Sequence, residues 1–273
     1  MLYCLITLVF VFAAWVVYSS RNLMLVVGLW ILHRRYDVNL SLATALDPHA
    51  TYLVMPNHPA IVDPLIVATE LHRIQLDIRP LVDESFFSNR LARHILALFD
   101  AVRVPDFRRI NFSPILKVRP TLHNSARRAK VLGFTVLATL TNGRNVLMYP
   151  SGHITADGRE TMSNRQLAYN VVSQLPAGVR VLGIRTRGLY GSMWSRVGGR
   201  PAPPFARTLA KAVCKWTVAG FRARRRVSMY VEDITDVVRG WVGNGRAEFN
   251  AMLEKWYDAD LLRDGKNREP VTF

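Results

Sequence analysis

The chain has 273 residues and half of them are hydrophobic, so it can bury a sizeable core and intrinsic disorder is excluded. Its formal net charge of +16 predicts an anionic partner, which charge alone leaves open between nucleic acid, a membrane surface and phosphorylated substrates. The two cysteines, Cys4 and Cys214, argue against a disulfide framework, and their spacing is not that of zinc ligands, so no metal is expected.

Two apolar runs open the chain. Residues 1–18 carry no charge, and residues 23–32 form a second run after the polar segment 19–22. The first run approaches the length of a membrane-spanning helix, whereas the second is too short to span. One interpretation is a single spanning helix with the flanking arginines on the cytoplasmic side, and the other is a helical hairpin in one leaflet, which the polar turn favours. Both predict a membrane anchor at residues 1–35 and a catalytic domain on the cytoplasmic face, and a buried core helix is the third interpretation.

The rest of the chain alternates short apolar runs with helical patterns. The predicted strands are residues 52–55, 78–82, 102–104, 146–149, 180–185 and 227–231. The predicted helices are residues 63–72, 89–98, 119–141, 165–175, 203–221 and 246–257. This alternation predicts a layered α/β domain with a central sheet over residues 36–260, followed by a polar tail at 261–273. In such domains, ligand sites gather at the ends of strands.

A histidine and an aspartate directly follow the first predicted strand, in Asn57-His58-Pro59-Ala60-Ile61-Val62-Asp63. If the chain turns at the proline and a helix begins near Asp63, its carboxylate can accept a hydrogen bond from one imidazole nitrogen of His58. The other nitrogen is then a base of fixed tautomer and orientation, able to deprotonate a hydroxyl group. A structural His–Asp pair is the other interpretation of this spacing. The remaining histidines, including His72, show no partner spacing that we can use.

The pattern N-H-x-x-x-x-D at residues 57–63 resembles the first motif of the glycerolipid acyltransferase family, whose members include lysophosphatidic acid acyltransferases. The resemblance implies a central mixed sheet flanked by helices. It also implies that His58 removes the proton of an acceptor hydroxyl, that Asp63 orients His58, and that Asn57 is a local positioning residue of the substrate site. The hydroxyl oxygen would then attack the thioester of acyl-CoA or acyl carrier protein, with no covalent acyl-enzyme and no cofactor.

A second motif follows the predicted strand at 146–149. Tyr149-Pro150-Ser151-Gly152-His153 is similar to the F-P-E-G-T-R motif of the same family. Tyr149 stands for phenylalanine, Pro150 and Gly152 match, and glycine lets the backbone approach a substrate closely. Ser151 replaces the glutamate and His153 the usual threonine or arginine, so a carboxylate role is lost while hydrogen-bond donors to phosphate are kept. The resemblance makes all five residues candidates for substrate binding.

Arginines in two further segments resemble the family more weakly. Arg103 follows the helix predicted at 89–98 on a short strand, and Arg185 and Arg187 lie at the end of the strand predicted at 180–185. The resemblance implies that such arginines hold the acceptor phosphate, for which a planar guanidinium can donate two parallel hydrogen bonds. A solvated surface charge is the alternative for each of the three.

Together with the predicted anchor, the resemblance implies a membrane-anchored acyltransferase of phospholipid biosynthesis. It would transfer a fatty acyl chain from acyl-CoA or acyl carrier protein to a lysophospholipid hydroxyl, with 1-acyl-sn-glycerol 3-phosphate as the first choice of acceptor. Another lysophospholipid, such as a lysophosphatidylethanolamine, is one alternative, and a non-catalytic lysolipid-binding protein is another because Ser151 replaces the glutamate. The arginine-rich segment 222–226 has no interleaved aromatic residues, so an anionic membrane surface is expected as partner and nucleic acid is not.

Overall fold

The computed structural model describes residues 32–88, 93, 96–97, 99–104, 122–199, 201, 203–219 and 224–259. The anchor predicted at 1–35 lies outside the described residues except for its last four positions. The tail predicted at 261–273 and most of the helix predicted at 89–98 also lie outside them. Within the described ranges, no helix combines the length and the apolar character needed to cross a membrane.

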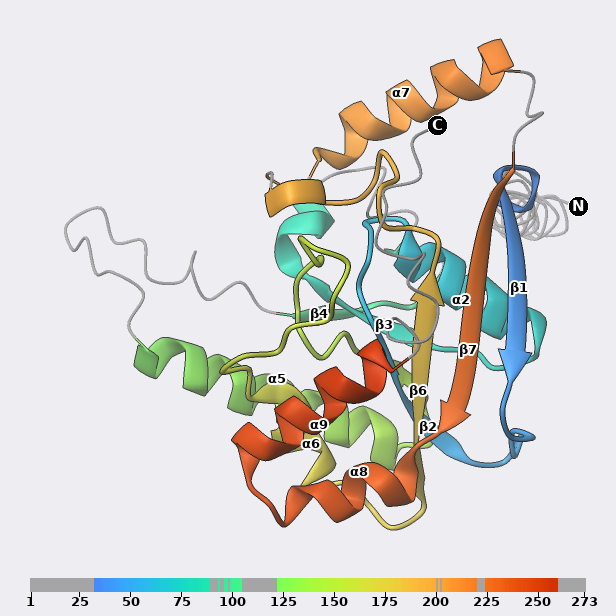
Figure 1. Cartoon of the computed structure of the whole chain (residues 1–273). Helices are drawn as coiled ribbons and strands as arrows, with labels where there is room; N and C mark the ends of the chain where they lie inside the picture. The colour runs from blue at the N-terminus through green and yellow to red at the C-terminus, as the bar shows by residue number, and fades with distance from the viewer. Residues whose placement is uncertain are drawn as a thin grey trace, which may run out of the picture.

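The strands of the described residues form one sheet in the order β1-β7-β6-β2-β5-β3-β4 (Figure 1). Their bounds are β1 Tyr36–Leu42, β2 Thr51–Pro56, β3 Arg79–Asp83, β4 Val102–Val104, β5 Val146–Leu147, β6 Val179–Arg187 and β7 Arg225–Asp233. Strands β6, β2, β5, β3 and β4 run parallel to one another, β7 is antiparallel to β6, and β1 is parallel to β7. The sheet is therefore mixed, as expected.

Helices follow most strands. Their bounds are α2 Asp63–Arg73, α5 Leu122–Thr141, α6 Leu167–Val172, α7 Phe205–Ala219, α8 Thr235–Val242 and α9 Arg246–Asp258, with short 3-10 turns at Glu84–Ser88 and Val197–Gly199. These helices and the strands lie within a few residues of the predicted ranges where both exist. Strand β1 and helix α8 were not predicted.

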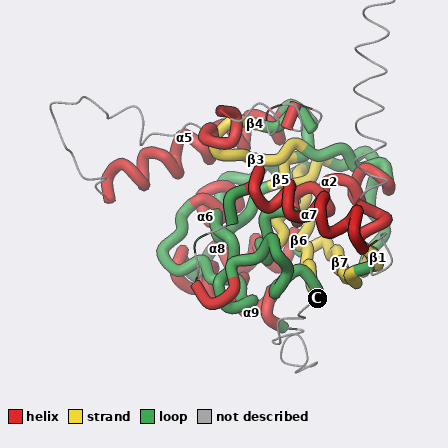
Figure 2. Tube along the Cα trace, turned by 90° about the horizontal axis from the view of Figure 1, so that it is seen from above, coloured by secondary structure: helices red, strands yellow, loops and turns green. Residues whose placement is uncertain are grey.

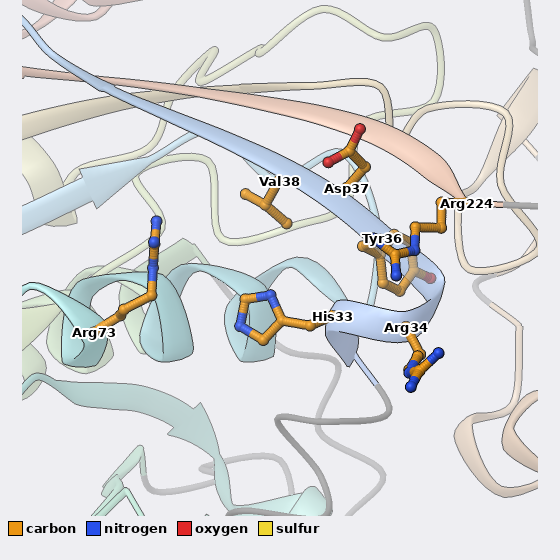
Figure 3. Close-up of a pocket in the computed structure, with 7 residues that line it drawn as sticks. All are labelled: His33, Arg34, Tyr36, Asp37, Val38, Arg73 and Arg224. Atoms are coloured by element: carbon orange, nitrogen blue, oxygen red, sulfur yellow. The ribbon is translucent and has the colours of Figure 1, made fainter.

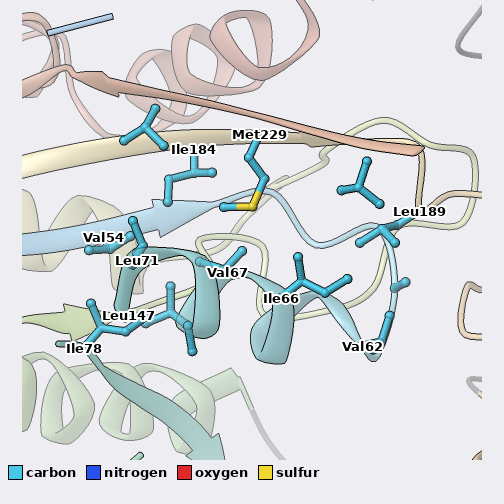
Figure 4. Close-up of a cluster of buried hydrophobic side chains, with 14 of the residues drawn as sticks. Val54, Val62, Ile66, Val67, Leu71, Ile78, Leu147, Ile184, Leu189 and Met229 are labelled. Carbon is cyan, nitrogen blue, oxygen red and sulfur yellow. The ribbon is translucent and has the colours of Figure 1, made fainter. Parts of the chain in front are cut away.

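The two faces of the sheet bury separate clusters of side chains. On one face, Ile66 and Val67 of α2 pack with Val54 of β2 (Figure 4). On the other face, Leu53 and Met55 pack with side chains of α5, α6, α8 and α9. Successive side chains of a strand point to opposite faces, so β2 reads as a continuous apolar run because both of its faces are covered.

One edge of the sheet gathers the segments that the motifs occupy. Strands β2 and β6 end at this edge, whereas β7 begins there, because Arg187 at the end of β6 pairs with Ser228. Figures 1 and 2 show α7 lying across this edge. Ala212 of α7 is buried in the cluster that α2 also joins. The exposed basic residues of α7 are Arg207, Lys211 and Lys215.

Candidate active site

The structure brings His58 and Asp63 together. The chain leaves β2, turns, and begins α2 at Asp63, whose amide donates to the carbonyl of Ala60 at 3.3 Å. Nδ1 of His58 lies 2.9 Å from Oδ2 of Asp63. Because a carboxylate accepts hydrogen bonds, Nδ1 carries the proton and Nε2 is left as the basic nitrogen. The His58 side chain is 16% exposed and that of Asp63 is 0% exposed, so the pair is buried with only the imidazole reaching the surface.

Asp63 accepts two further hydrogen bonds. The Ala60 amide donates to Oδ2 at 3.3 Å, and the Tyr149 hydroxyl donates to Oδ1 at 2.7 Å. The Tyr149 ring also stacks on the His58 imidazole, with ring centroids 4.2 Å apart and an angle of 29° between the planes. Tyr149 was predicted only as a substrate-binding residue, yet here it holds both members of the dyad. The tyrosine hydroxyl could have indicated this role from the sequence, because the phenylalanine of the family motif could stack on the imidazole but could not donate a hydrogen bond.

The electrostatic surroundings favour a protonatable imidazole and a protonated phenol. Burial lowers the pKa of His58, but attraction to Asp63, the hydrogen bond to Asp63 and the charge of Glu160 together raise it above its ordinary value. Burial, followed by the charge of Asp63, raises the pKa of Tyr149 well above its usual range. Tyr149 therefore remains a hydrogen-bond donor to Asp63 throughout the neutral pH range.

Asn57 anchors the loop that carries His58. Its side-chain amide donates to the carbonyl of Thr186 at 3.1 Å, and its side-chain oxygen accepts from the Thr186 amide at 2.7 Å. Its own amide donates to the carbonyl of Ile184 at 3.2 Å. The side chain thus continues the pairing of β2 with β6 by one residue beyond the strand. Asn57 therefore fixes the loop on β6, and its predicted role in substrate binding stays a prediction.

Glu160 is a functional candidate that the sequence did not indicate. Its Oε2 accepts a hydrogen bond from the His58 amide at 3.0 Å, and the residue is 4% exposed. Burial raises the pKa of Glu160 to about 7, against the lowering effects of Ser151, the His58 amide and the His58 charge. It lies in an irregular loop nine residues after Ser151, where no periodicity marks a buried side chain. A carboxyl group is therefore present beside His58 although position 151 has none.

The remaining residues of the second motif form a turn beside this carboxyl group. Ser151 is buried, and its hydroxyl donates to the His153 carbonyl at 3.0 Å. Nδ1 of His153 donates to the Ser151 carbonyl at 2.8 Å, and Pro150 is buried. Gly152 is exposed, has φ +63°, and a Cβ there would meet nothing within 4 Å. The turn therefore requires glycine for its left-handed backbone rather than for space.

Arg103 lies away from the dyad. It is on the edge strand β4, and three strand spacings separate β4 from β2, which is about 15 Å. Its guanidinium stacks over the Phe87 ring at 4.6 Å from the centroid, and the residue is exposed. It is the middle residue of the three-residue strand β4, opposite Val82, and β4 runs parallel to β2.

Arg185 and Arg187 contact α9. The Arg185 guanidinium lies 4.5 Å from the Tyr230 ring centroid and 4.7 Å from that of Trp256. Its Nη2 is 3.6 Å from Oε2 of Glu232, and the Arg187 guanidinium donates to the Tyr257 carbonyl. These contacts tie β6 to the last turn of α9, where cations favour the exposed carbonyl groups. The structure does not bring either guanidinium into contact with the dyad.

The same five-residue spacing occurs a second time. Nδ1 of His72 lies 2.6 Å from Oδ1 of Asp77, so His72 does have a partner, contrary to the expectation from sequence. Those side chains are 59% and 86% exposed, respectively. Spacing alone therefore brings histidine and aspartate together without marking a site. Burial, a third residue on the aspartate and a carboxyl group behind the histidine distinguish the His58–Asp63 pair.

Replacing Tyr149 with phenylalanine is expected to raise the pKa of His58. The ring would still stack, but the Asp63 carboxylate would lose its hydroxyl donor and would interact more strongly with the imidazolium. An NMR titration of the histidine ring protons measures this shift. Tyr190→Phe is the matched control, because that hydroxyl donates to the Ala156 carbonyl at 3.0 Å and does not touch the dyad. An unchanged or lower His58 pKa in Tyr149→Phe would contradict the assigned contact.

Comparison with known proteins identifies the family and the fold. The family whose sequence model matches the chain is described as Acyltransferase, and the match covers residues 37–185. The fold is similar to the crystal structure of the 1-acyl-sn-glycerophosphate (LPA) acyltransferase PlsC from Thermotoga maritima, with a TM-score of 0.50, 12% sequence identity, and coverage of 91% of this chain and 79% of that one. No curated protein matches the chain. Because the family match covers more than half of the 273 residues, this protein belongs to the glycerolipid acyltransferase family.

Proposed function

We propose that this protein transfers a fatty acyl chain from acyl-CoA or acyl carrier protein to a hydroxyl group of a lysophospholipid. The observation that carries the proposal is the buried Asp63 carboxylate, which holds Nδ1 of His58 and leaves Nε2 as a base. The proposed acceptor is 1-acyl-sn-glycerol 3-phosphate. The activity named for the similar Thermotoga maritima protein supports that choice.

The proposed reaction needs one base and one orienting carboxylate. Nε2 of His58 accepts the proton of the acceptor hydroxyl while its oxygen attacks the thioester carbonyl carbon. The carbon–sulfur bond then breaks, the new ester leaves, and the imidazolium returns the proton to the thiolate. Asp63 stabilises the imidazolium between these steps, and Tyr149 and Ala60 keep the carboxylate in place.

We also propose that the sheet edge that bears His58 faces the cytoplasmic surface of an anionic membrane. A cavity of about 240 Å³ lies where β1 and β7 begin, and its basic lining residues are His33, Arg34, Arg73 and Arg224 (Figure 3). The exposed basic residues of α7 lie across the same edge. Each basic residue near an anionic surface contributes about 1 kcal/mol of attraction. The predicted anchor precedes β1, so it would hold this edge of the sheet against the bilayer. The acyl chains of the substrate could then stay in the bilayer while its head group reaches the site.

Thiol release from acyl-CoA and acyl carrier protein tests the proposal. Detergent-solubilised protein would be assayed with lysophosphatidic acid, lysophosphatidylethanolamine and other lysophospholipids. We expect release to require an acceptor, and the acceptor that gives the highest kcat/KM to be 1-acyl-sn-glycerol 3-phosphate. Binding of lysolipid without thiol release from any donor would contradict the proposal and favour the lysolipid-binding alternative. A different best acceptor would correct the head group alone.

A further inference from the structure

The Glu160 carboxyl group lies behind the histidine of the dyad rather than beside its ring. Oε2 accepts a hydrogen bond from the main-chain amide of His58, and the Thr155 amide donates to the His58 carbonyl at 2.9 Å. One loop therefore holds both main-chain polar groups of His58. Oε1 has no hydrogen-bond partner among the described residues, although Glu160 is buried. The Ser151 hydroxyl nevertheless lies close enough to this carboxyl group to lower its pKa, against burial, which raises it.

The far side of this loop is fixed by α9. Oε1 of Glu254 accepts hydrogen bonds from the Met162 amide and, at 3.0 Å, from the Ser163 amide. A hydrogen bond from the Glu160 amide lowers the pKa of Asp258, against burial, which raises it. The Tyr257 hydroxyl donates to the Met55 carbonyl at 2.8 Å. The loop is thus hydrogen-bonded to α9 at one end and to His58 after β2 at the other, which is the support that a positioned base requires.

We propose that Glu160 is a positioning residue of the active site, whose carboxyl group holds the main chain of His58 so that Nε2 faces the acceptor hydroxyl. Ser151 replaces the glutamate of the family motif. Glu160, nine residues further along the chain, supplies a carboxyl group beside the same turn. This inference rests on the proposed function, because a base needs fixing only where a proton is to be removed.

The charge of Glu160 acts on the same histidine. Ionised Glu160 contributes to the raised pKa of His58, and His58 in turn lowers the pKa of Glu160. The charge state of each group therefore affects the titration of the other. The other groups that interact with Glu160 are Asp63, Tyr149, Ser151, Tyr257 and Asp258. Burial raises the pKa of the neighbouring Asp258, and the charges of Arg187 and Arg159 lower it.

The test compares Glu160→Ala with Glu160→Gln in the full chain. Alanine removes the acceptor, and a misplaced base is expected to lower kcat by about a hundredfold. Glutamine keeps an oxygen that can accept from the His58 amide, so it should recover most of that kcat. Both variants lack the negative charge, so the pKa of His58 measured by NMR should fall, with His72 as the internal reference. Glu70→Gln is the matched control, because it neutralises another buried carboxyl group, which pairs with Arg73 on α2, and it should leave kcat and the His58 pKa unchanged.

A glutamine variant as impaired as the alanine variant, or an unchanged kcat in Glu160→Ala, would overturn the proposal. The histidine titration separates this failure from that of the proposed function. Were the wild-type protein to release no thiol with any donor and acceptor, the proposed function would fail. A His58 pKa that is the same in wild type and Glu160→Gln would then also reject the assigned contact of Glu160, whereas a lowered pKa would support it.

Discussion

Replacing His58 with alanine is expected to lower acyl transfer by about 10²- to 10⁴-fold, which is the usual contribution of a positioned general base. The effect should fall on kcat, because the imidazole acts on the acceptor proton in the transition state rather than on ground-state binding. The fold should survive. The main-chain contacts of His58 with Glu160 and Thr155 do not involve its ring, and the ring lies at the surface of the site. Thiol release with a lysophospholipid acceptor measures the change.

His72→Ala is the matched control for this prediction. His72 has the same spacing to its aspartate and a hydrogen bond of similar length, but both side chains are exposed. Its removal should leave kcat and KM unchanged within a factor of two or so, as expected for a surface substitution. A His58→Ala variant that keeps more than about a tenth of wild-type kcat would contradict the assignment of His58 as the base.

Local patterns were sufficient to predict most of the sheet. The apolar runs that became β2 and β6 are buried on both faces, so their composition marks them clearly. Strand β1 carries a strict alternation, Tyr-Asp-Val-Asn-Leu-Ser-Leu, that predicts a strand with one buried face, yet it was not assigned. Because it lies just after the apolar N-terminal run, this alternation was not separated from that run. Helix α8 was not predicted because it has only eight residues, including Gly240, and so is too short to show a helical pattern clearly.

In the candidate site too, contacts between residues close in sequence could be predicted, and contacts between distant residues could not. His58 and Asp63 are five residues apart, so one turn brings them together and spacing could predict the pair. Tyr149 and Glu160 reach the same place from 86 and 102 residues away in sequence. Only the pairing of β5 with β2 brings the segment that follows β5 to that edge, and no local pattern records it. The sequence therefore could not predict that Glu160 supplies a carboxyl group near the position where Ser151 replaces the glutamate of the family motif.

For the three arginines, the sequence predicted the strand that carries each residue but not the contacts of its side chain. Their residue type fits phosphate, and the sequence placed them on the correct strands, but strand position alone does not say what a side chain touches. Arg185 lies on β6 with its guanidinium between the rings of Tyr230 and Trp256. Its alternation with Ile184, which is buried beside α2, directs it to the opposite face of the sheet. Phosphate binding by any of the three arginines stays a prediction.

Replacing Asp63 with asparagine is expected to lower kcat by a factor similar to that of His58→Ala, about 10²- to 10⁴-fold, while the protein still folds. The Ala60 amide can only donate to the atom that replaces Oδ2, so the oxygen of asparagine should occupy that position. Its amide nitrogen would then face Tyr149, whose hydroxyl can rotate to accept. His58 would keep its tautomer, but the charge that stabilises the imidazolium would be gone.

The direction of the pH profile distinguishes this loss of charge from a loss of structure. Attraction to Asp63 is the largest effect that raises the pKa of His58, so in Asp63→Asn that pKa falls and the rising limb of kcat/KM moves to lower pH. Asp77→Asn, beside exposed His72, should leave the profile unchanged.

Asp63→Ala should behave differently, because it leaves one buried and two partly buried donors without an acceptor. Each unsatisfied donor costs about 1–3 kcal/mol, so the midpoint of urea unfolding should fall sharply in that variant and little in Asp63→Asn. If Asp63→Asn kept wild-type kcat, the carboxylate would merely hold the turn. Loss of kcat in Asp63→Asn without loss of stability would instead require that its charge acts on the imidazolium.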